Sequence, residues 1–354
     1  MPSAQGGRPN IRERLRRFGL RTGWGRIVTV GLGLGVLGVA LAQPAGRPRR
    51  EITLTAQSVP LSAAQPSLDQ VGEFKYLGGL WLQSEDPGFG GLSGLAVSNS
   101  AGGPRILAVT DQGDKFTASA VLKEGRLQRL ESPTLEPLVG PNDAAIMGKV
   151  LGDAESLTRL PDGRILVGFE RRHRIWAYGP DLTGPAVPFA TPPALERSPS
   201  NGGLESLVNW PDGRILAITE SLERTDGTMA AFLWSGGVWS ELEWKPSEPG
   251  FEPADATVAP NGDLLVLERY FSALPPVRLS SRVLRVKAET VKAGARLTGE
   301  LVAELTAPLV SENFEGIAAR SNAEGRTEIV LASDNNFSSI QRTLLLWFEL
   351  KPPR

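Results

Sequence analysis

The sequence predicts an all-β protein that folds as a β-propeller of five four-stranded blades. One observation is a repeated pattern, which is ESLTRLPDGRILVGFE from Glu155 and ESLVNWPDGRILAITE from Glu205. A second is that another hairpin-like segment follows each copy except the last, which gives four strands per repeat. A third is the repeat period of about 50 residues, which is typical of propeller blades. No helical apolar periodicity of useful length lies between the copies, and this argues against βαβ units.

Three further copies of the pattern bring the number of blades to five. They are DATVAPNGDLLVLE, EGIAARSNAEGRTEIVLASD and the most divergent one, GLSGLAVSNSAGGPRILAVTD. A sixth blade, built from segments around residues 51–90 and 134–152, is the alternative. Only one clear strand, residues 342–350, follows the last copy. We expect FKYLGGLWLQ, near the start of the domain, to pair with it, so that the two ends of the chain close the ring and leave no free edge.

The turn in the middle of each copy predicts how its two strands are aligned. Asp-Gly and Asn-Gly pairs favour two-residue type I′ turns. Such turns place the acids of each copy directly opposite each other, with Cβ atoms about 4.5–5.5 Å apart. Carboxylates that close repel unless a cation or a shared proton lies between them. The expected pairs are Glu155 with Glu170, Glu205 with Glu220, Asp255 with Glu268, and Glu315 with Asp334, while Gly94 faces Asp111.

The acids are expected to meet, because the first strand of each propeller blade lines the central channel. A group of carboxylates at one end of that channel needs positive charge, and Ca²⁺ is the cation that fits oxygen ligands best. Arg171 and Arg269 lie beside the acids, and either neutralise them or hold an anionic substrate. The alternative is that acids at strand ends only discourage edge pairing. The predicted metal ligands are Asp111, Glu155, Glu170, Glu205, Glu220, Asp255, Glu268, Glu315 and Asp334.

Composition excludes several classes of site. The formal net charge is −1, so the charge balance gives no argument for a nucleic-acid partner. The chain has no cysteine, which excludes disulfides, thiolate metal sites and a cysteine nucleophile. His173 is the single histidine, which excludes zinc sites with two or three histidines. We expect it on the surface or in a loop.

The N-terminal segment predicts export. Residues 1–42 combine a basic start with an apolar stretch at 27–42 and end on Ala40-Leu41-Ala42, which has the form of a cleavage site. The apolar stretch is shorter than the roughly 20 residues of a membrane span, so a signal peptide is favoured over an uncleaved anchor. Residues 43–70 are expected to be a linker and residues 71–354 the propeller domain. We expect a periplasmic or secreted monomer, held at a membrane only if the segment stays uncleaved.

Several motifs resemble those of a known family. GLSGLAV followed by ILAVTDQG, the DAESL and LESL hairpins, and NFEGIA followed by IVLASDNN resemble the phytase-like domain family of secreted bacterial proteins, labelled "esterase-like activity of phytase". The resemblance covers roughly residues 75–350. It implies a propeller related to β-propeller phytases, which bind phosphate esters through calcium ions in an acidic channel. Asp255-Ala256-Thr257 departs from the Glu-Ser-Leu pattern of the family. By resemblance, the motif positions hold Asp111, Glu155, Glu205, Glu315 and Asp334.

The leading functional hypothesis is a calcium-dependent hydrolase of phosphate esters or related esters, with a small anionic ester as substrate. Bound metal would activate a water and neutralise developing charge, and carboxylates free of metal would position or deprotonate that water. The predicted catalytic residues are Glu155, Glu205, Arg171 and Arg269. This chemistry requires neither cysteine nor histidine.

The sequence leaves three alternatives to this hypothesis open. A serine hydrolase would use Ser93, Ser156 or Ser206 with His173, but the G-x-S-x-G elbow needs a strand-turn-helix setting and GGLSGLA is typical of a strand. A calcium-stabilised propeller could bind a ligand or protein partner without catalysis, since propellers host many unrelated functions. A lactonase-type propeller enzyme also uses calcium, but its histidine-containing base arrangements are hard to build with a single histidine.

Overall fold

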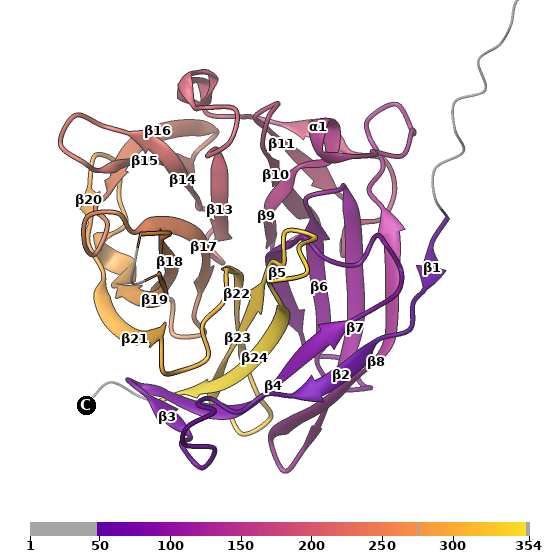
Figure 1. Cartoon of the computed structure of the whole chain (residues 1–354). Coiled ribbons are helices and arrows are strands. Elements are labelled where there is room, and N and C mark those ends of the chain that lie inside the picture. The colour runs from indigo at the N-terminus through magenta and orange to yellow at the C-terminus, as the bar shows by residue number, and fades with distance from the viewer. Residues whose placement is uncertain (1–47, 275–276, 352–354) are drawn as a thin grey trace, which may run out of the picture. The chain divides into compact units, whose positions relative to one another are not determined.

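Five sheets surround a common centre in the computed structural model, which describes residues 48–274 and 277–351 (Figure 1). The all-β prediction and the propeller architecture are confirmed. Residues 1–42, the expected signal peptide, lie outside the described residues. Within the described part of the chain, no helix is long and apolar enough to span a membrane.

The blades follow one another along the chain, and each places its first strand at the centre. Blades 1 and 2 contain, from the centre outward, β5 (Leu92–Ser98), β6 (Arg105–Thr110), β7 (Asp114–Lys123), β8 (Arg126–Pro137) and β1 (Arg50–Glu51), then β9 (Ala154–Arg159), β10 (Ile165–Phe169), β11 (Arg174–Tyr178) and β12 (Val187–Phe189). Blades 3 and 4 contain β13 (Leu204–Asn209), β14 (Ile215–Glu223), β15 (Met229–Ser235), β16 (Val238–Trp244) and β20 (Arg296–Leu297), then β17 (Glu252–Val258), β18 (Leu264–Ser272), β19 (Arg278–Val286) and β21 (Glu300–Thr306).

Blade 5 joins the two ends of the chain. Its strands are β22 (Phe314–Ser321), β23 (Thr327–Ser333), β24 (Thr343–Leu350), β4 (Phe74–Gln83) and β2 (Thr55–Ser58), with β3 (Gln70–Val71) paired to β4. The antiparallel pairing of β4 with β24 confirms the predicted closure of the ring. Figure 1 shows the indigo β4 beside the yellow β24. Short helical segments lie in the connections: α1 (Lys149–Gly152), η1 (Pro180–Leu182), η2 (Pro193–Arg197) and η3 (Ala288–Thr290).

Part of the segment before the propeller forms strands. Within residues 43–70, β1 pairs with β8 of blade 1 and β2 pairs with β4 of blade 5. The segments that left a sixth blade open therefore extend blades 1 and 5, and the ring has five blades. Unpaired edges of outer strands expose backbone donors and acceptors, and the N-terminal residues cover two of these edges.

The hydrophobic core is divided among the five gaps between neighbouring blades, with one apolar cluster in each gap. Side chains alternate between the two faces of a strand, and both faces of each blade are covered. In β10, for example, Ile165 and Val167 pack toward blade 1 and Leu166 packs toward blade 3. This arrangement explains why the middle strands are continuous apolar runs instead of alternating ones.

The turns of the first hairpins are longer than predicted. In blade 2, the Leu160 N–H donates to the Arg164 carbonyl (2.8 Å) and the Gly163 N–H donates to the Leu160 carbonyl (3.0 Å). Gly163 has a φ of 88°, in the left-handed region that glycine adopts readily. This geometry is a type I turn followed by a glycine bulge, which makes a three-residue loop. It shifts the strand pairing by one residue from the predicted register.

A β-bulge near the open end of each first hairpin shifts the register again. In blade 2, Ala154 pairs with Phe169 and Ser156 pairs with Gly168, so Glu155 lies in the bulge. Glu170 then lies opposite Asp153, whose carbonyl accepts its N–H (2.8 Å). Bulges of this kind re-aim a side chain. The predicted direct opposition is therefore wrong for Glu155 with Glu170, Glu205 with Glu220, Asp255 with Glu268, Glu315 with Asp334, and Gly94 with Asp111.

One buried carboxylate ties three blades together. Asp255, on β17, is only 1% exposed. Its Oδ2 accepts the Ile317 N–H of blade 5 (2.8 Å), its Oδ1 accepts the Ala256 N–H (2.8 Å), and the Leu95 N–H of blade 1 also donates to it. Burial raises the pKa of Asp255, although these three donors act in the opposite direction. Asp255 thus joins inner strands of neighbouring blades.

Replacing Asp255 should loosen the ring. The change Asp255→Ala leaves buried N–H donors of blades 1, 4 and 5 without an acceptor, and we expect it to lower the free energy of unfolding by about 3 kcal/mol, since each such group costs roughly 1–3 kcal/mol. Denaturant unfolding measures this loss. Ser206→Ala is the matched control, because Ser206 occupies the same position in blade 3 and its buried Oγ has no hydrogen-bond partner among the described residues. Equal stability losses in the two variants would contradict this role of Asp255.

Candidate functional site

Each blade offers three positions at the same end of the ring. The first immediately precedes or begins the inner strand, the second follows two residues later in the bulge region, and the third lies at the end of the second strand, opposite the first. We call this end of the ring the acid mouth. Its first positions are Gly91, Asp153, Gly203, Glu252 and Asn313, its second positions are Ser93, Glu155, Glu205, Ala254 and Glu315, and its third positions are Asp111, Glu170, Glu220, Arg269 and Asp334.

Seven of the nine predicted metal ligands occupy positions of the acid mouth. They are Asp111, Glu155, Glu170, Glu205, Glu220, Glu315 and Asp334. The other two, Asp255 and Glu268, are displaced by one residue, because the turn and the bulge change the register of blade 4. The Glu268 carboxylate accepts the Trp244 Nε1–H (2.8 Å) and the Ser247 N–H (3.1 Å). Asp255 and Glu268 thus face other parts of the protein.

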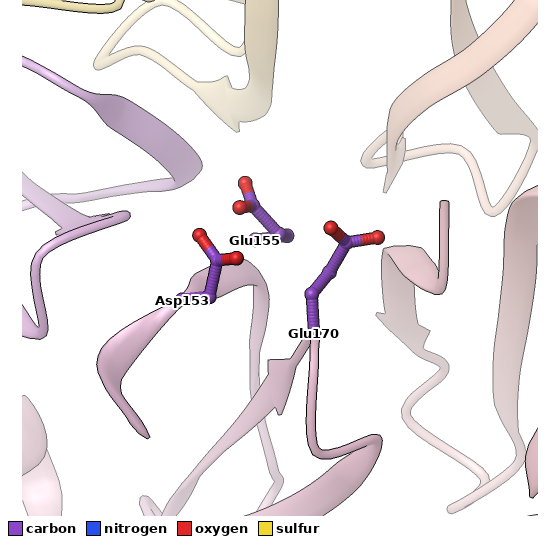
Figure 2. Close-up of side chains that lie close together, drawn as sticks. All are labelled: Asp153, Glu155 and Glu170. Carbon is purple, nitrogen blue, oxygen red and sulfur yellow. The ribbon is translucent and has the colours of Figure 1, made fainter. Parts of the chain in front are cut away.

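Carboxylates of blades 2 and 3 form two triads. In one triad, Asp153, Glu155 and Glu170 each place an oxygen within 4.8 Å of the others. Figure 2 shows these three carboxyl groups gathered beside one another. In the other triad, Glu170 meets Glu205 and Glu220 within the same distance. Glu170 therefore belongs to both triads and links blade 2 to blade 3.

Backbone donors hold the shared carboxylate in place. Oε1 of Glu170 accepts the Gly202 N–H (2.6 Å) and the Gly203 N–H. Gly202 has a φ of 116°, a conformation that glycine adopts at little cost. A Cβ atom on Gly203 would lie 2.4 Å from His173 Nδ1. The glycine pair therefore permits a close approach of blade 3 to Glu170, and this approach orients the carboxylate before any ligand binds.

Basic side chains neutralise the acids on the blade 1 side of the mouth. Lys149 Nζ lies 2.7 Å from Asp111 Oδ2 and 3.5 Å from Asp153 Oδ1. Arg171 Nε lies 2.6 Å from Asp153 Oδ2. The hydrogen bond and charge of Asp111 raise the pKa of Lys149 against the opposing effect of burial. Burial likewise raises the pKa of Asp111, although Lys149 counteracts it.

Arg269 neutralises acids on the opposite side. Its Nη1 donates to Glu315 and to Asn313 Oδ1 (2.8 Å), and its Nη2 donates to Glu220. Burial alone would lower the pKa of Arg269, but Glu315, Glu220 and Glu205 raise it. Both terminal nitrogens of this guanidinium are thus bonded to groups of the neighbouring blades 3 and 5.

In the described structure, Glu155 and Glu205 have no direct basic partner, although the charge of Arg269 acts on Glu205 and opposes the effect of burial on its pKa. Within the described part of the chain, neither has a salt bridge within 4.0 Å. They are 8% and 6% exposed. Burial raises the pKa of both carboxyls well above the ordinary value. The negative charges of nearby acids raise it further, and the largest of these contributions comes from Glu315 for Glu155 and from Glu220 for Glu205. A cation between them would remove this cost.

The site also contains residues that sequence reasoning missed. Asp153 immediately precedes the Glu-Ser-Leu segment of blade 2, and its place in the DAESL motif was a usable signal. Lys149 lies on α1 and Asn313 precedes β22. Only the path of the connections between strands brings these two side chains to the acids. Glu252 lies opposite Arg269, and burial raises its pKa. No repeat pattern pointed to these last three residues.

The described serines and the histidine form no nucleophile–base pair. Ser156 Oγ donates to the Leu204 carbonyl (2.9 Å). Ser93 and Ser206 have buried hydroxyl groups without hydrogen-bond partners. His173 is half-buried, and its Nε2 bonds to the Pro199 carbonyl (2.8 Å). These contacts give the serine hydrolase alternative no support.

The donor set of the triads fits Ca²⁺. Ca²⁺ takes six to eight oxygen ligands in flexible geometry, and every ligand atom in both triads is a carboxylate oxygen. Asp153 is fully buried, and among the described residues its Oδ1 accepts no hydrogen bond, although Lys149 Nζ lies 3.5 Å away. The residues that would hold the ion are Asp153, Glu155, Glu170, Glu205 and Glu220.

Comparison with known proteins assigns the chain to a family. The family model described as "Phytase-like: Esterase-like activity of phytase" matches residues 87–337. The chain belongs to this phytase-like family. No curated protein matches it.

One solved structure supports the fold of this phytase-like protein, and others are similar to it at lower TM-scores. The catalytic domain of the Coprinopsis cinerea GH62 alpha-L-arabinofuranosidase is 12% identical with a TM-score of 0.50, and the alignment covers 84% of this chain and 97% of that one. A luciferin-regenerating enzyme is 11% identical with a TM-score of 0.39, covering 85% and 100% of the two chains. A putative gluconolactonase is 12% identical with a TM-score of 0.38, covering 84% and 99%. At these identities, the match to the arabinofuranosidase shows the fold alone.

The buried acids predict that the metal-free protein loses stability as the pH rises. Burial, then the charge of Glu315, raises the pKa of Asp334 to about 8, from an ordinary value near 3.8. The folded state therefore binds more protons than the unfolded state between about pH 4 and 8, and unfolding becomes easier across that range. Thermal melts of metal-free protein from pH 5 to 9 measure this slope.

The variant Asp334→Asn provides the control for this pH dependence. It cannot ionise, so its melting temperature should fall less steeply between pH 5 and 8 than that of the wild type. Identical slopes for the two proteins would contradict the raised pKa of Asp334.

Proposed function

We propose that this phytase-like protein is an exported, calcium-dependent hydrolase of phosphate esters or related esters, with its reaction centre in the acid mouth. The observation that carries the proposal is the pair of carboxylate triads that share Glu170. Glu155 and Glu205 belong to these triads and have no basic partner within salt-bridge distance in the described structure. Such a set of oxygen donors favours a hard divalent cation. The family description, which names phytase and esterase-like activity, supports this class of reaction.

The residues of the acid mouth would have different roles in such a reaction. A bound Ca²⁺ would supply charge stabilisation and a more acidic water. Glu170 is held by backbone N–H groups and presents a fixed carboxylate to both triads. Glu155 and Glu205 complete the ion site, and whichever carboxylate oxygen is free of the ion positions or deprotonates the attacking water.

Arg171 is the residue we assign to the anionic substrate. Its Nε is bound to Asp153, but its side chain is 35% exposed, so the rest of the guanidinium can donate to phosphoryl or carboxyl oxygens. Arg269, the second arginine predicted to take part in catalysis, has both terminal nitrogens bonded to groups of the protein. We therefore give direct substrate contact to Arg171.

The compartment and partners follow from the sequence. The basic and apolar N-terminal segment supports export to the periplasm or the exterior, where calcium is more available than in the cytoplasm. A small anionic ester is the proposed partner, and the protein is proposed to act as a monomer. Membrane attachment enters the proposal only for a form in which the N-terminal segment stays uncleaved.

A second candidate function is a calcium-stabilised propeller that binds a ligand or partner and catalyses nothing. The burial of the triads favours it, because all their members are less than 9% exposed and little of their surface is open to a substrate. Thermal melts with and without calcium, combined with a hydrolase screen, separate the two functions. Stabilisation by calcium without turnover of any ester supports the binding protein.

Hydrolysis should depend on calcium and on the unpaired glutamates. We expect Glu155→Gln and Glu205→Gln each to lower kcat/KM for a model phosphomonoester by about 10²-fold or more, because each change removes an ion ligand or the group that activates water. Chelation of calcium should abolish turnover, and added calcium should restore it. A spectrophotometric assay of p-nitrophenyl phosphate, with p-nitrophenyl acetate in parallel, measures both effects.

Asp263→Asn is the control for these variants. Asp263 is also a buried acid, but it lies beside the turn at the opposite end of blade 4 and pairs with Lys287. Its replacement should leave kcat/KM within about twofold of the wild type, as expected of a site away from the chemistry. Turnover that persists after chelation, or that is absent for both esters with calcium added, would contradict the proposal.

A further inference from the structure

We infer that Arg269 is a built-in counter-ion, which occupies one cation position of the acid mouth and so limits the number of divalent ions that the mouth binds. The inference deepens the proposed function and rests on it for the identity of the ion. It gives Arg269 a role different from substrate binding: the guanidinium takes the place of a metal ion.

The position of Arg269 in the repeat is the first observation. The third position of the mouth is an acid in every other blade: Asp111, Glu170, Glu220 and Asp334. In blade 4 this position holds Arg269, which lies opposite Glu252. The second position of the same blade is Ala254, where blades 2, 3 and 5 have glutamates. Blade 4 thus has an acid, Glu252, only at the first of its three positions, and it has a cation at the third.

The contacts of Arg269 show what this cation neutralises. Its Nη2 binds Glu220 of blade 3 and its Nη1 binds Glu315 of blade 5. The guanidinium therefore lies between carboxylates of the two neighbouring blades and supplies there the positive charge that a divalent ion would supply. A guanidinium remains protonated in proteins, so this positive charge is permanent.

The opposite sector of the mouth contrasts with this arrangement. Asp153 is fully buried and already pairs with Lys149 and Arg171, although its Oδ1 accepts no hydrogen bond within the described residues. Glu155 and Glu205 are more than nine-tenths buried and lack any salt bridge in the described structure. The oxygen atoms that still require a cation therefore belong to blades 2 and 3, and the sector between blades 3 and 5 is already supplied.

This division has a chemical consequence. A guanidinium balances charge and donates hydrogen bonds, but it cannot coordinate a water molecule and make it more acidic as a metal ion does. By occupying the sector next to blade 5, Arg269 confines metal-dependent chemistry to the sector that contains Glu155, Glu205 and Arg171. The residue thus sets both the number and the place of the ions.

Counting the bound ions tests the inference. Isothermal titration and equilibrium dialysis with CaCl₂ alone, on the purified full chain, give the number of Ca²⁺ ions per molecule. Arg269→Met should bind one more ion than the wild type, and calcium should raise its melting temperature by more than it raises that of the wild type. Arg269→Lys keeps the charge and should bind the wild-type number of ions.

Arg320→Met is the matched control. Arg320 lies on β22, the strand that carries Glu315, but near its other end, and it pairs with the buried Glu328 (3.1 Å). The variant also loses a partly buried arginine from an ion pair, and it should bind the same number of ions as the wild type. An extra ion in Arg320→Met would overturn the inference, because the gain would not be specific to the mouth.

The outcomes for wild type and Arg269→Met separate this inference from the proposed function. If the wild type binds calcium and Arg269→Met binds no additional ion, the counter-ion inference is wrong and the proposed function stands. If only Arg269→Met binds calcium, the inference stands and the proposed function fails, and if neither binds calcium, both fail. A variant that folds only with calcium supports the inference. One that stays unfolded at saturating calcium overturns it, because the ion then cannot replace the guanidinium.

Discussion

Repulsion among buried carboxylates is the interaction around which the acid mouth is organised. Two charges 4 Å apart interact with about 4 kcal/mol at an effective dielectric constant of 20, so several acids at one end of a ring need compensation. The chain supplies it with basic side chains at Lys149, Arg171 and Arg269. It also supplies backbone N–H groups to Glu170 and a raised pKa at Asp334. Within the described residues, Glu155 and Glu205 have no salt bridge, and this makes a cation there a physical expectation.

Two structural features bring these acids together: closure of the ring and a β-bulge in each first hairpin. Closure of blade 5 by β4 and β24 places the five inner strands around one centre, with apolar clusters filling every gap between blades. The β-bulges then re-aim the second-position side chains at the open end of each first hairpin. A shared architecture with local variation at equivalent positions is how propellers host different functions. Here blade 4 differs from the other blades in having a basic residue, Arg269, at the third position.

Much of the fold was accessible from the sequence, because hairpin turns and strand pairing leave local signals. The repeats predicted the blades, and FKYLGGLWLQ predicted the strand that closes the ring. The register of the strands in the first hairpins could not be predicted as well from the sequence. Asp-Gly favours a two-residue turn, but Pro161, Asp162 and Gly163 form a three-residue loop, and the bulge adds a further shift. For this reason Glu170 lies opposite Asp153 instead of Glu155, and Asp255 and Glu268 leave the group of acids.

The sequence by itself determined the repeat, the number of clear blades and seven of the acids at the mouth, because these follow from residue patterns within each hairpin. Only the tertiary structure decided which charges meet. Lys149 and Asn313 reach the acids through loops without a repeat signal, and Arg269 bridges Glu220 and Glu315 from blades that are distant in the chain. The physical reason is that the energy of a charge depends on its neighbours in space and on its distance from water. Those neighbours are set when the ring closes.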